Sequence, residues 1–345
     1  MPINEILSGL AKAAGPAGAE GSAAKLAMEL LGDCNAAVRQ DAMGNIIAEF
    51  GNGSASEHIL LDAHIDEIGL IVTMVDDKGF LHVANTGGAD RRTLSGAEVY
   101  VYGKKRLSGI ICCTPPHLST SSSRGKAPEW DEVYIDVGYP ADKARELVPA
   151  GSRVVVRARP HMLAGERITS KALDNRAGAA ALIRVVELLE HESSRLHCRV
   201  TVLLSVMEEV GGQGATTAAF ATEPTQAVAV DVSFAAQPGV KKEQSGVLGG
   251  GPMIGISPVL DRKITTALRD IAESRGIEYQ TEIMGGNTGT NADNISLSRG
   301  GIRCGLVSIP IRNMHTAVEV ADMDDIEATA RLLAEFVRKG GAPRA

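Results

Sequence analysis

Acidic residues and histidines stand directly after several short apolar segments of this chain. His64 and Asp66 follow HILLDA, Glu208 and Glu209 follow VTVLLSVM, and Asp231 follows AVAV. Apolar runs of this length are typical of buried strands in an α/β sheet, and ligands bind beyond the carboxyl ends of such strands. If these strands are neighbours, we expect the side chains to converge on one site.

The adjacent carboxylates Glu208 and Glu209 are the strongest indication of a metal. Two carboxylates that emerge from a buried strand repel each other, and they are costly to remove from water without a positive charge nearby. Arg199 is the nearest basic residue before the pair, and none follows closely after it. A bound cation is therefore the simplest source of the missing positive charge.

Taken singly, the other residues have simpler explanations. A histidine after a strand, such as His64, is more often a hydrogen-bonded structural residue than a ligand. Asp174 stands immediately before the helical segment NRAGAAAL, where it could cap the helix. Asp231 could be a strand-end carboxylate whose hydrogen bonds are satisfied. The metal hypothesis therefore depends on these residues acting as a set.

The set is completed by Asp174 and by His315, which follows the segment SIPIRNM. Two histidines with several carboxylates suit two divalent cations that share one bridging carboxylate and one water. Mixed imidazole and carboxylate ligands favour zinc, cobalt or manganese over calcium or magnesium. Such a pair activates a water and polarises a carbonyl, and the doubled glutamate leaves one carboxylate free to move the proton.

The elements that must position these residues form an alternating pattern. We predict strands at 45–50, 58–64, 199–209, 227–233 and 302–310, and helices at 6–13, 22–31, 175–190 and 263–276. This alternation is typical of an α/β sheet with helices on both faces. Residues 70 to about 160 show short alternating segments between turn residues, which predict an inserted all-β domain. Within it, the Ser-rich segment 117–130 is expected to be a mobile loop.

Composition excludes several classes of function. The chain has 35 Lys and Arg against 42 Asp and Glu, a formal net charge of −7, and no basic stripe that would favour nucleic acid. Its five cysteines are scattered without a CxxC pair, which indicates a reducing compartment. There is no signal-peptide pattern, and the apolar runs are far shorter than the roughly 18 residues of a membrane span. We therefore expect a soluble, cytoplasmic protein without a membrane partner.

Five ordered motifs carry a family resemblance: DAHIDEIGLIV (62–72), SKALDNRAG (170–178), VMEEVGGQGA (206–215), AVDVS (229–233) and SIPIRNMHTAVEV (308–320). Together with GTNADNIS (289–296), they resemble the M42 family of metallo-aminopeptidases, which includes glutamyl and tetrahedral (TET) aminopeptidases. The resemblance implies a three-layer α/β/α catalytic domain of the zinc-peptidase type, formed by 1–68 and 163–345. It also implies an inserted PDZ-like or barrel-like domain, 69–162, that mediates dimerisation and assembly.

The resemblance also assigns roles that the residues alone leave open. It implies that His64 and Asp231 bind one metal, that Asp174 bridges the two ions, and that Glu209 and His315 bind the second. In the same family pattern, Glu208 is the general base and then the acid. Asp66 orients the ring of His64, as carboxylates do for ligating histidines.

The expected function is removal of N-terminal residues from short peptides, in an oligomer such as the twelve-subunit tetrahedral particles of many members. A deacylase or carboxypeptidase on the same two-metal scaffold is the alternative. An endoglucanase is disfavoured, because no second carboxylate pair is evident and the chain has one Trp and 3% aromatic residues. Arg262 and Lys263 could pair with an acidic substrate, although a solvated charged turn explains them more simply.

Overall fold

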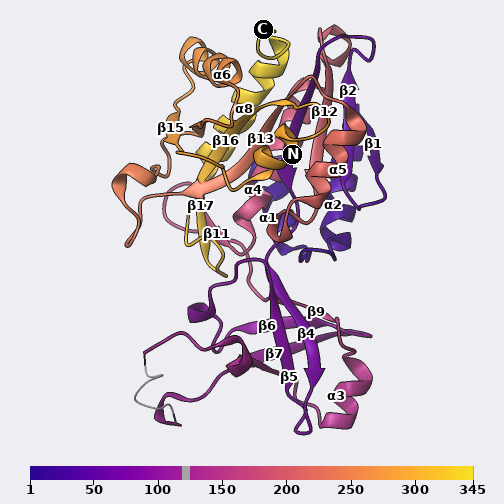
Figure 1. The fold of residues 1–345 in the computed structure, drawn as a ribbon, viewed down its shortest axis with the longest axis vertical. Helices are drawn as coiled ribbons and strands as arrows, with labels where there is room; N and C mark the ends of the chain where they lie inside the picture. Colours follow the sequence, from indigo (N-terminus) through magenta and orange to yellow (C-terminus); the bar gives the residue numbers. More distant parts are fainter. Residues whose placement is uncertain (119–124, 345) are drawn as a thin grey trace.

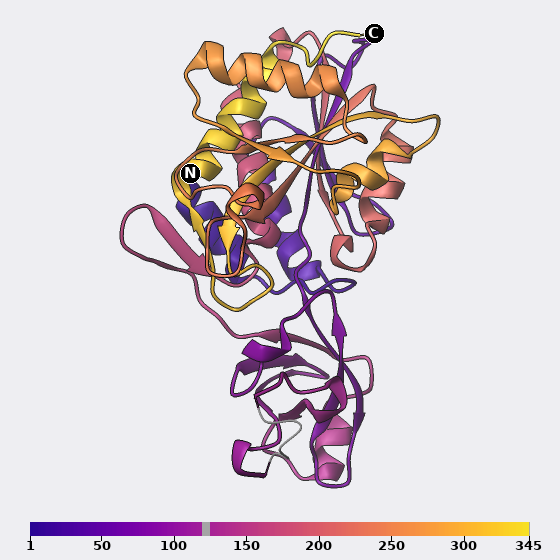
Figure 2. The same ribbon diagram turned by 60° about the vertical axis from the view of Figure 1, so that its left-hand side comes forward.

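The computed structural model describes residues 1–118 and 125–344, which form an α/β domain and a smaller β domain that projects from it (Figure 1). Figure 2 shows the same separation from another side. The helices are α1 (Ile3–Lys12), α2 (Gly21–Gly32), α3 (Ala141–Leu147), α4 (Leu173–Leu189), α5 (Gln213–Thr222), α6 (Arg262–Arg275), α7 (Asn291–Ser296) and α8 (Met323–Arg338). Among the described residues, no helix is long and apolar enough to cross a membrane. The loop expected at 117–130 lies partly outside the described residues.

The large sheet has the strand order β1-β2-β12-β3-β13-β16-β17-β11-β10, and β14 and β15 extend it beside β16. Its central strands β12, β3, β13 and β16 run parallel to one another. The bounds are β1 (Ala37–Gln40), β2 (Ile46–Gly51), β3 (His58–His64), β10 (His161–Met162), β11 (Arg167–Ser170), β12 (Arg199–Ser205), β13 (Gln226–Phe234), β14 (Met253–Ile256), β15 (Gln280–Ile283), β16 (Arg303–Arg312) and β17 (Glu319–Asp322).

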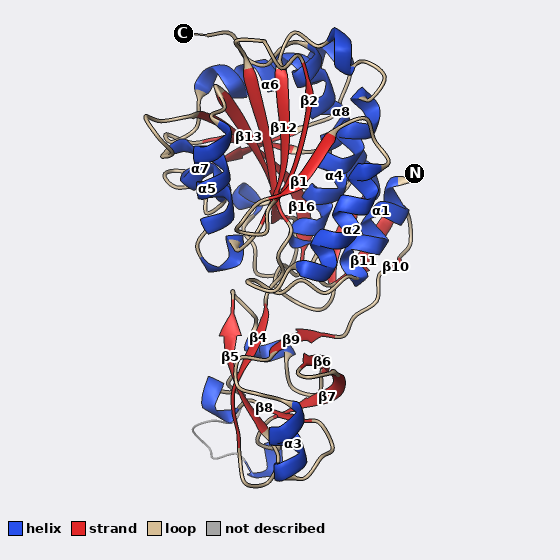
Figure 3. Ribbon diagram, turned by 90° about the vertical axis from the view of Figure 1, so that its right-hand side faces the viewer, coloured by secondary structure: helices blue, strands red, loops and turns tan. Residues whose placement is uncertain are grey.

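Helices cover both faces of this sheet and make three layers (Figure 3). Helices α1, α2, α4, α6 and α8 share one core with the sheet, while α5 and α7 share another on the opposite face. Strand β3 is buried along its whole length because its side chains enter both cores in alternation. Ile59 and Leu61 face the larger core, and Leu60 faces the smaller one. A strand buried on both faces explains the largely apolar run that precedes His64, in which Asp62 is the polar exception within Ile59–Ala63.

The inserted domain is a closed barrel with the strand order β4-β5-β8-β7-β6-β9. Its strands are β4 (Gly69–Val75), β5 (Leu81–Thr86), β6 (Glu98–Tyr102), β7 (Arg106–Cys112), β8 (Tyr134–Asp136) and β9 (Arg153–Val156). Alternate residues of β7 are buried and exposed, as expected for a strand with one face on a core. The barrel has its own core, which includes Leu70, Val99 and Ile135. The predicted α/β domain with a small inserted all-β domain is therefore confirmed.

One predicted strand differs near the doubled glutamate. The strand expected at 199–209 ends at Ser205, and residues Glu208–Val210 form a short 3₁₀ helix, η5. Met207, which precedes η5, has a left-handed backbone conformation with φ of 59°. The chain turns away from the sheet at this point, so the two glutamates lie on the turn and not on the strand.

Candidate active site

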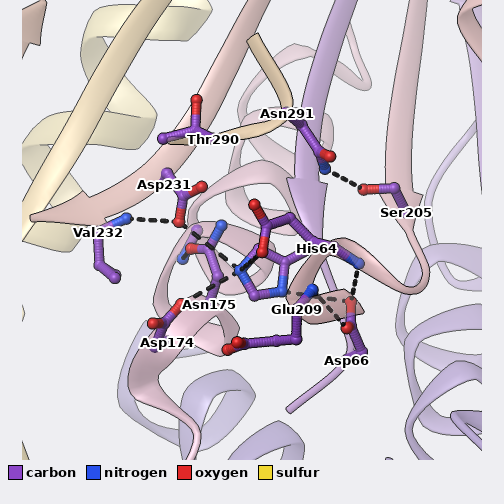
Figure 4. Close-up of polar contacts among 12 residues, drawn as sticks. His64, Asp66, Asp174, Asn175, Ser205, Glu209, Asp231, Val232, Thr290 and Asn291 are labelled. Carbon is purple, nitrogen blue, oxygen red and sulfur yellow. Dashed lines mark hydrogen bonds and ion pairs between the residues drawn. The ribbon is translucent and has the colours of Figure 1, made fainter. Parts of the chain in front are cut away.

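Figure 4 shows the predicted site residues His64, Asp66, Asp174, Glu209 and Asp231 together near the carboxyl ends of the central strands. His64 is the last residue of β3, and Asp231 lies in the last half of the parallel strand β13. Glu208 and Glu209 are in η5 after β12, which is the other neighbour of β3. Parallel neighbouring strands end at one edge of a sheet, and this arrangement explains how segments far apart in the sequence meet.

A first group of possible metal ligands consists of His64, Asp174 and Asp231. The Nε2 atom of His64 is 3.1 Å from Oδ1 of Asp174 and 3.6 Å from Oδ1 of Asp231. All three residues are buried, and their ligand atoms lie within 4.8 Å of one another. A single cation could therefore contact all three side chains.

A second group consists of Asp174, Glu209 and His315. The Nε2 atom of His315 is 3.1 Å from Oδ2 of Asp174 and 3.4 Å from Oε1 of Glu209. Asp174 therefore presents one carboxylate oxygen to each group. Asp174 lies in the first turn of α4 with non-helical dihedral angles. The partners of its carboxylate are the two imidazoles, so helix capping does not explain this residue.

The remaining two predicted residues lie beside these groups without joining either. The Oε2 atom of Glu208 is 4.0 Å from Nε2 of His64, and its side chain is 17% exposed. The two carboxylate oxygens of Asp66 accept the backbone N–H groups of Glu208 at 3.0 Å and Glu209 at 3.1 Å. Asp66 Oδ1 is also 3.4 Å from Nδ1 of His64. Asp66 therefore links the η5 turn to the end of β3.

The charge balance of this cluster fits divalent cations. Five carboxylates meet at the site, and within the described part of the chain their ion-pair partners are the two histidines alone. Burying this much negative charge without cations is unfavourable. The donor set of imidazole nitrogens and carboxylate oxygens suits zinc, cobalt and manganese. The residues present therefore fit a pair of divalent metal ions.

The electrostatics of the histidines show the same excess of negative charge. Burial lowers the pKa of His64, but hydrogen-bonding contacts with Asp174 and Asp231 outweigh burial and raise that pKa well above its usual value. Burial likewise opposes the charged form of His315, yet contacts with Asp174 and Glu209 raise its pKa to about 11. Without metal, both rings act as the counter-charges of the carboxylates.

Glu208 has the opposite shift. Burial raises the pKa of Glu208 to about 8, and the charges of Asp231 and Glu209 add to the effect, while His64 opposes it. A carboxyl group with a pKa near neutrality can both accept and release a proton under ordinary conditions. This property suits a group that transfers a proton in the reaction.

Glu319 is a site residue to which the sequence analysis gave no role. Its side chain is buried, with Oε2 accepting the backbone N–H of Asp174 at 3.1 Å and Oε1 accepting that of His315 at 2.8 Å. Glu319 therefore fixes the backbone of two members of the second group, Asp174 and His315. Its position four residues after His315, inside a motif already noted, was the available indication.

A second buried polar cluster lies behind the site. Oδ2 of Asp62 accepts a hydrogen bond from Nδ2 of Asn291 at 3.0 Å, and the same nitrogen contacts Oγ of Ser205 at 3.0 Å. Burial raises the pKa of Asp62 to about 7, although hydrogen bonds from Ser205 and Asn291 oppose the shift. The cluster ties β3 and β12 to the start of α7. The sequence concealed it because Asp62 lies inside an apolar run.

A cavity of about 960 Å³ opens beside the two groups. Beyond the site residues, it is lined by side chains from β13 to β16, among them Ser233, Phe234, Met253, Glu282, Met284, Leu306 and Ser308. Arg262 and Lys263 do not line it, and Nζ of Lys263 donates to the backbone carbonyl of Arg344 at 3.0 Å. The structure therefore gives no support to the idea that these two bases bind an acidic substrate.

Known proteins resemble this chain along nearly its whole length. The profile of the family described as M42 glutamyl aminopeptidase matches residues 44–332. Lysyl aminopeptidase of Pyrococcus furiosus is 33% identical over 314 residues, which are 89% of this chain and 88% of the relative. An aminopeptidase from the archaeon Desulfurococcus kamchatkensis has a TM-score of 0.90 at 32% identity and covers 98% of this chain and 94% of its own.

A further solved structure is that of the TET1 peptidase of Pyrococcus horikoshii, which can assemble into a tetrahedron or a large octahedral shell. It has a TM-score of 0.85 at 32% identity and covers 97% of this chain and 99% of its own. Agreement of the family profile, the relatives and the solved structures establishes that the protein is a hydrolase that belongs to the M42 family of aminopeptidases.

Proposed function

We propose that the protein removes the N-terminal residue from short peptides, with two divalent metal ions and a glutamate general base. The observation that carries the proposal is the shared carboxylate of Asp174, which contributes one oxygen to each of two ligand groups. A free carboxylate, Glu208, lies beside the same groups. These features together suit hydrolysis of an amide bond by an activated water.

Five residues would hold the two ions. His64 and Asp231 would bind the first ion, Glu209 and His315 would bind the second, and Asp174 would bridge them. Zinc is the best match to these donors, with cobalt or manganese as substitutes. When bound, such a pair supplies an activated water and polarises the carbonyl of the first peptide bond.

Glu208 would carry the proton during the reaction. Its carboxylate takes one proton from the attacking water, and the same proton then passes to the nitrogen of the departing amine. Burial raises the pKa of Glu208, which makes its carboxylate a better proton acceptor than an exposed glutamate. The proton is conserved through this cycle, so Glu208 returns to its starting state.

Asp66 and Glu319 would be positioning residues. Asp66 holds the backbone of Glu208 and Glu209 through two N–H groups. Glu319 holds the backbone of Asp174 and His315 in the same way. Both therefore act through the residues they hold and do not touch the substrate.

Self-association is part of the proposal. The TET1 peptidase similar to this chain can assemble into a tetrahedron or a large octahedral shell, and we infer that the inserted domain of this chain, residues 69–162, mediates assembly. An enclosed active site would admit short peptides and exclude folded proteins. The five cysteines are free thiols, which is consistent with the cytoplasmic location that the sequence predicts.

The test combines metal analysis with rates on amino-acid p-nitroanilides and N-acetylated counterparts. We expect about two ions per chain, loss of activity after chelation and recovery on addition of zinc, cobalt or manganese. The N-acetylated substrates should not be cleaved, because an aminopeptidase needs a free amine. Cleavage of only the N-acetylated substrates would indicate a deacylase, and cleavage only from the C-terminus of longer peptides would indicate a carboxypeptidase.

A further inference from the structure

Glu282 is a carboxylate in the cavity that the proposed reaction does not use. It lies on β15, is half-buried and lines the cavity. Its carboxylate accepts hydrogen bonds from the hydroxyl groups of Ser308, at 2.7 Å, and Ser233. Both partners are neutral, and among the described residues no Lys or Arg forms an ion pair with Glu282. The negative charge is thus held in place by hydroxyl groups while no cation neutralises it.

The two serines that hold Glu282 lie next to Asp231, a member of the first group of possible metal ligands. Ser308 on β16 is the register partner of Asp231 on the parallel strand β13. Ser233 is two residues beyond Asp231 on β13, so its side chain lies on the same face of the sheet. The two hydroxyls that hold Glu282 therefore belong to the positions next to a proposed metal ligand. A side chain on the first residue of a bound peptide could reach from the metal groups to this carboxylate.

Apolar side chains line the cavity beside the two serines that hold Glu282. Met253, Met284 and Leu306 line the cavity. Met253 lies on β14, where it is the register partner of Ser308 on β16. Apolar walls with one carboxylate match a side chain that has a long aliphatic stem and a cationic end.

Two other charged residues line the cavity, Lys241 and Glu243. Both are exposed, so water screens their charges, and their opposite signs offset each other. Outside the two ligand groups, Glu282 is therefore the least exposed of the charged side chains that line the cavity.

We propose that Glu282 selects peptides whose N-terminal residue is lysine or arginine. The ammonium or guanidinium group binds the Glu282 carboxylate, and the aliphatic stem packs against Met253, Met284 and Leu306. A glutamate or aspartate at the same position is repelled by the same charge. This inference rests on the proposed aminopeptidase function and specifies the substrate class of that site.

The test compares lysyl and norleucyl p-nitroanilides, since norleucine has the stem of lysine without its charge. For the wild type, we expect kcat/KM to be at least about tenfold higher for the lysyl substrate, as for a hydrogen bond between charged groups. In Glu282→Gln, the lysyl value should fall by about that factor while the norleucyl value stays nearly constant. Glu243→Gln removes an exposed carboxylate of the same cavity and should leave the ratio of the two substrates unchanged.

Several results would overturn the inference. A wild-type enzyme that prefers norleucyl or glutamyl substrate would exclude it outright. An equal loss for both substrates in Glu282→Gln would assign Glu282 to the substrate α-amino group or to support of the strands. If Glu282→Gln does not fold, Glu282→Asp keeps the charge but shortens its reach, and an unchanged lysyl-to-norleucyl ratio in that variant contradicts the proposal. Failure of the proposed function differs from all of these, because then no free-amine substrate is cleaved by the wild type.

Discussion

Asp174 and Glu208 illustrate how neighbouring carboxylates acquire different tasks. Asp174 contacts an imidazole through each oxygen, at 3.1 Å in both cases, and is placed to be shared. Glu208 belongs to neither ligand group, and burial raises its pKa to about 8. The environment of each carboxylate thus favours a charged ligand in one case and a group that exchanges a proton in the other.

Replacement of Glu208 by glutamine tests this division. Gln has nearly the same shape but cannot accept the proton, so we expect kcat to fall by about a hundredfold to ten thousandfold. Metal content should stay at the wild-type level, because Glu208 is not in either ligand group. Steady-state kinetics and elemental analysis of the same sample measure both quantities. A variant with most of its rate, or one without metal, would show that the assignment of the base is wrong.

The titration of the metal-free site leads to a prediction on pH. Without metal the pKa of His315 is raised to about 11 and that of His64 is raised well above its usual value, so both rings are protonated at neutral pH. A ring must lose a proton before it can bind a metal. Metal binding should therefore release protons, and affinity should rise as pH increases from about 6 to about 8.

Titration calorimetry of the metal-free protein measures this release. The apparent enthalpy of zinc binding is compared in buffers of different ionisation enthalpy at one pH, and its slope gives the number of protons released. We expect a clearly positive number above one per chain. An enthalpy that is independent of the buffer would mean that the histidines are already neutral, in conflict with the contacts described.

At the scale of elements, a buried ion pair fixes the segment that carries Asp174. Nζ of Lys171, between β11 and α4, is 2.5 Å from Oε2 of Glu67, which follows β3. Glu67 also accepts the backbone N–H of Gly15 at 2.9 Å, and both charged side chains are buried. The ends of β3 and β11, with the residues that follow them, are thereby held together on the side of the site that faces the barrel.

Replacement of Lys171 by methionine should destabilise the protein strongly. Removing Lys171 leaves the buried charge of Glu67 with the more distant guanidinium of Arg176, at 3.8 Å, and breaking a buried ion pair typically costs about 3–5 kcal/mol. We expect the thermal midpoint to fall by about 5 °C or more in a differential scanning measurement. The double variant Lys171→Met, Glu67→Gln should not recover the loss, because it removes the carboxylate 3.8 Å from the buried guanidinium of Arg176. A midpoint unchanged in the single variant would contradict this account.

The elements also show what the sequence could and could not predict. The strands that carry His64 and Asp231 were predictable because they are buried on both faces and are rich in consecutive apolar residues. The strand β15, by contrast, is short, alternates between half-buried and exposed residues, and has no apolar periodicity. It was not predicted, although it carries Glu282.

The contacts that complete the site were hidden for a different reason. Glu319 binds the backbone of Asp174 across 145 positions of sequence, and the carbonyl of Gly88 lies 3.1 Å from Nδ1 of His315 across 227 positions. Such pairings depend on the packed structure, and no local pattern encodes them. Residue types indicated a metal centre, but the division of the ligands into two groups was implied by family resemblance alone.

At the scale of the whole molecule, the inserted barrel domain has a core of its own and also contacts the candidate active site. Its core is separate from the two cores of the α/β domain. The loop after β5 nevertheless reaches back to the site, where the Gly88 carbonyl contacts His315. The domain that we propose to mediate assembly is therefore coupled directly to one proposed ligand of the second metal.

Removal of the barrel tests both roles. Leu70 and Val154 are register partners on adjacent strands, so a short linker can replace the residues between β4 and β9 without separating the ends. We expect light scattering to give a mass well above that of one chain for the wild type and the mass of a single chain for the shortened protein. Activity should also fall, because His315 loses its hydrogen-bonding partner and binds the second ion less firmly. A shortened protein that keeps the wild-type mass would place the contacts between subunits on the α/β domain.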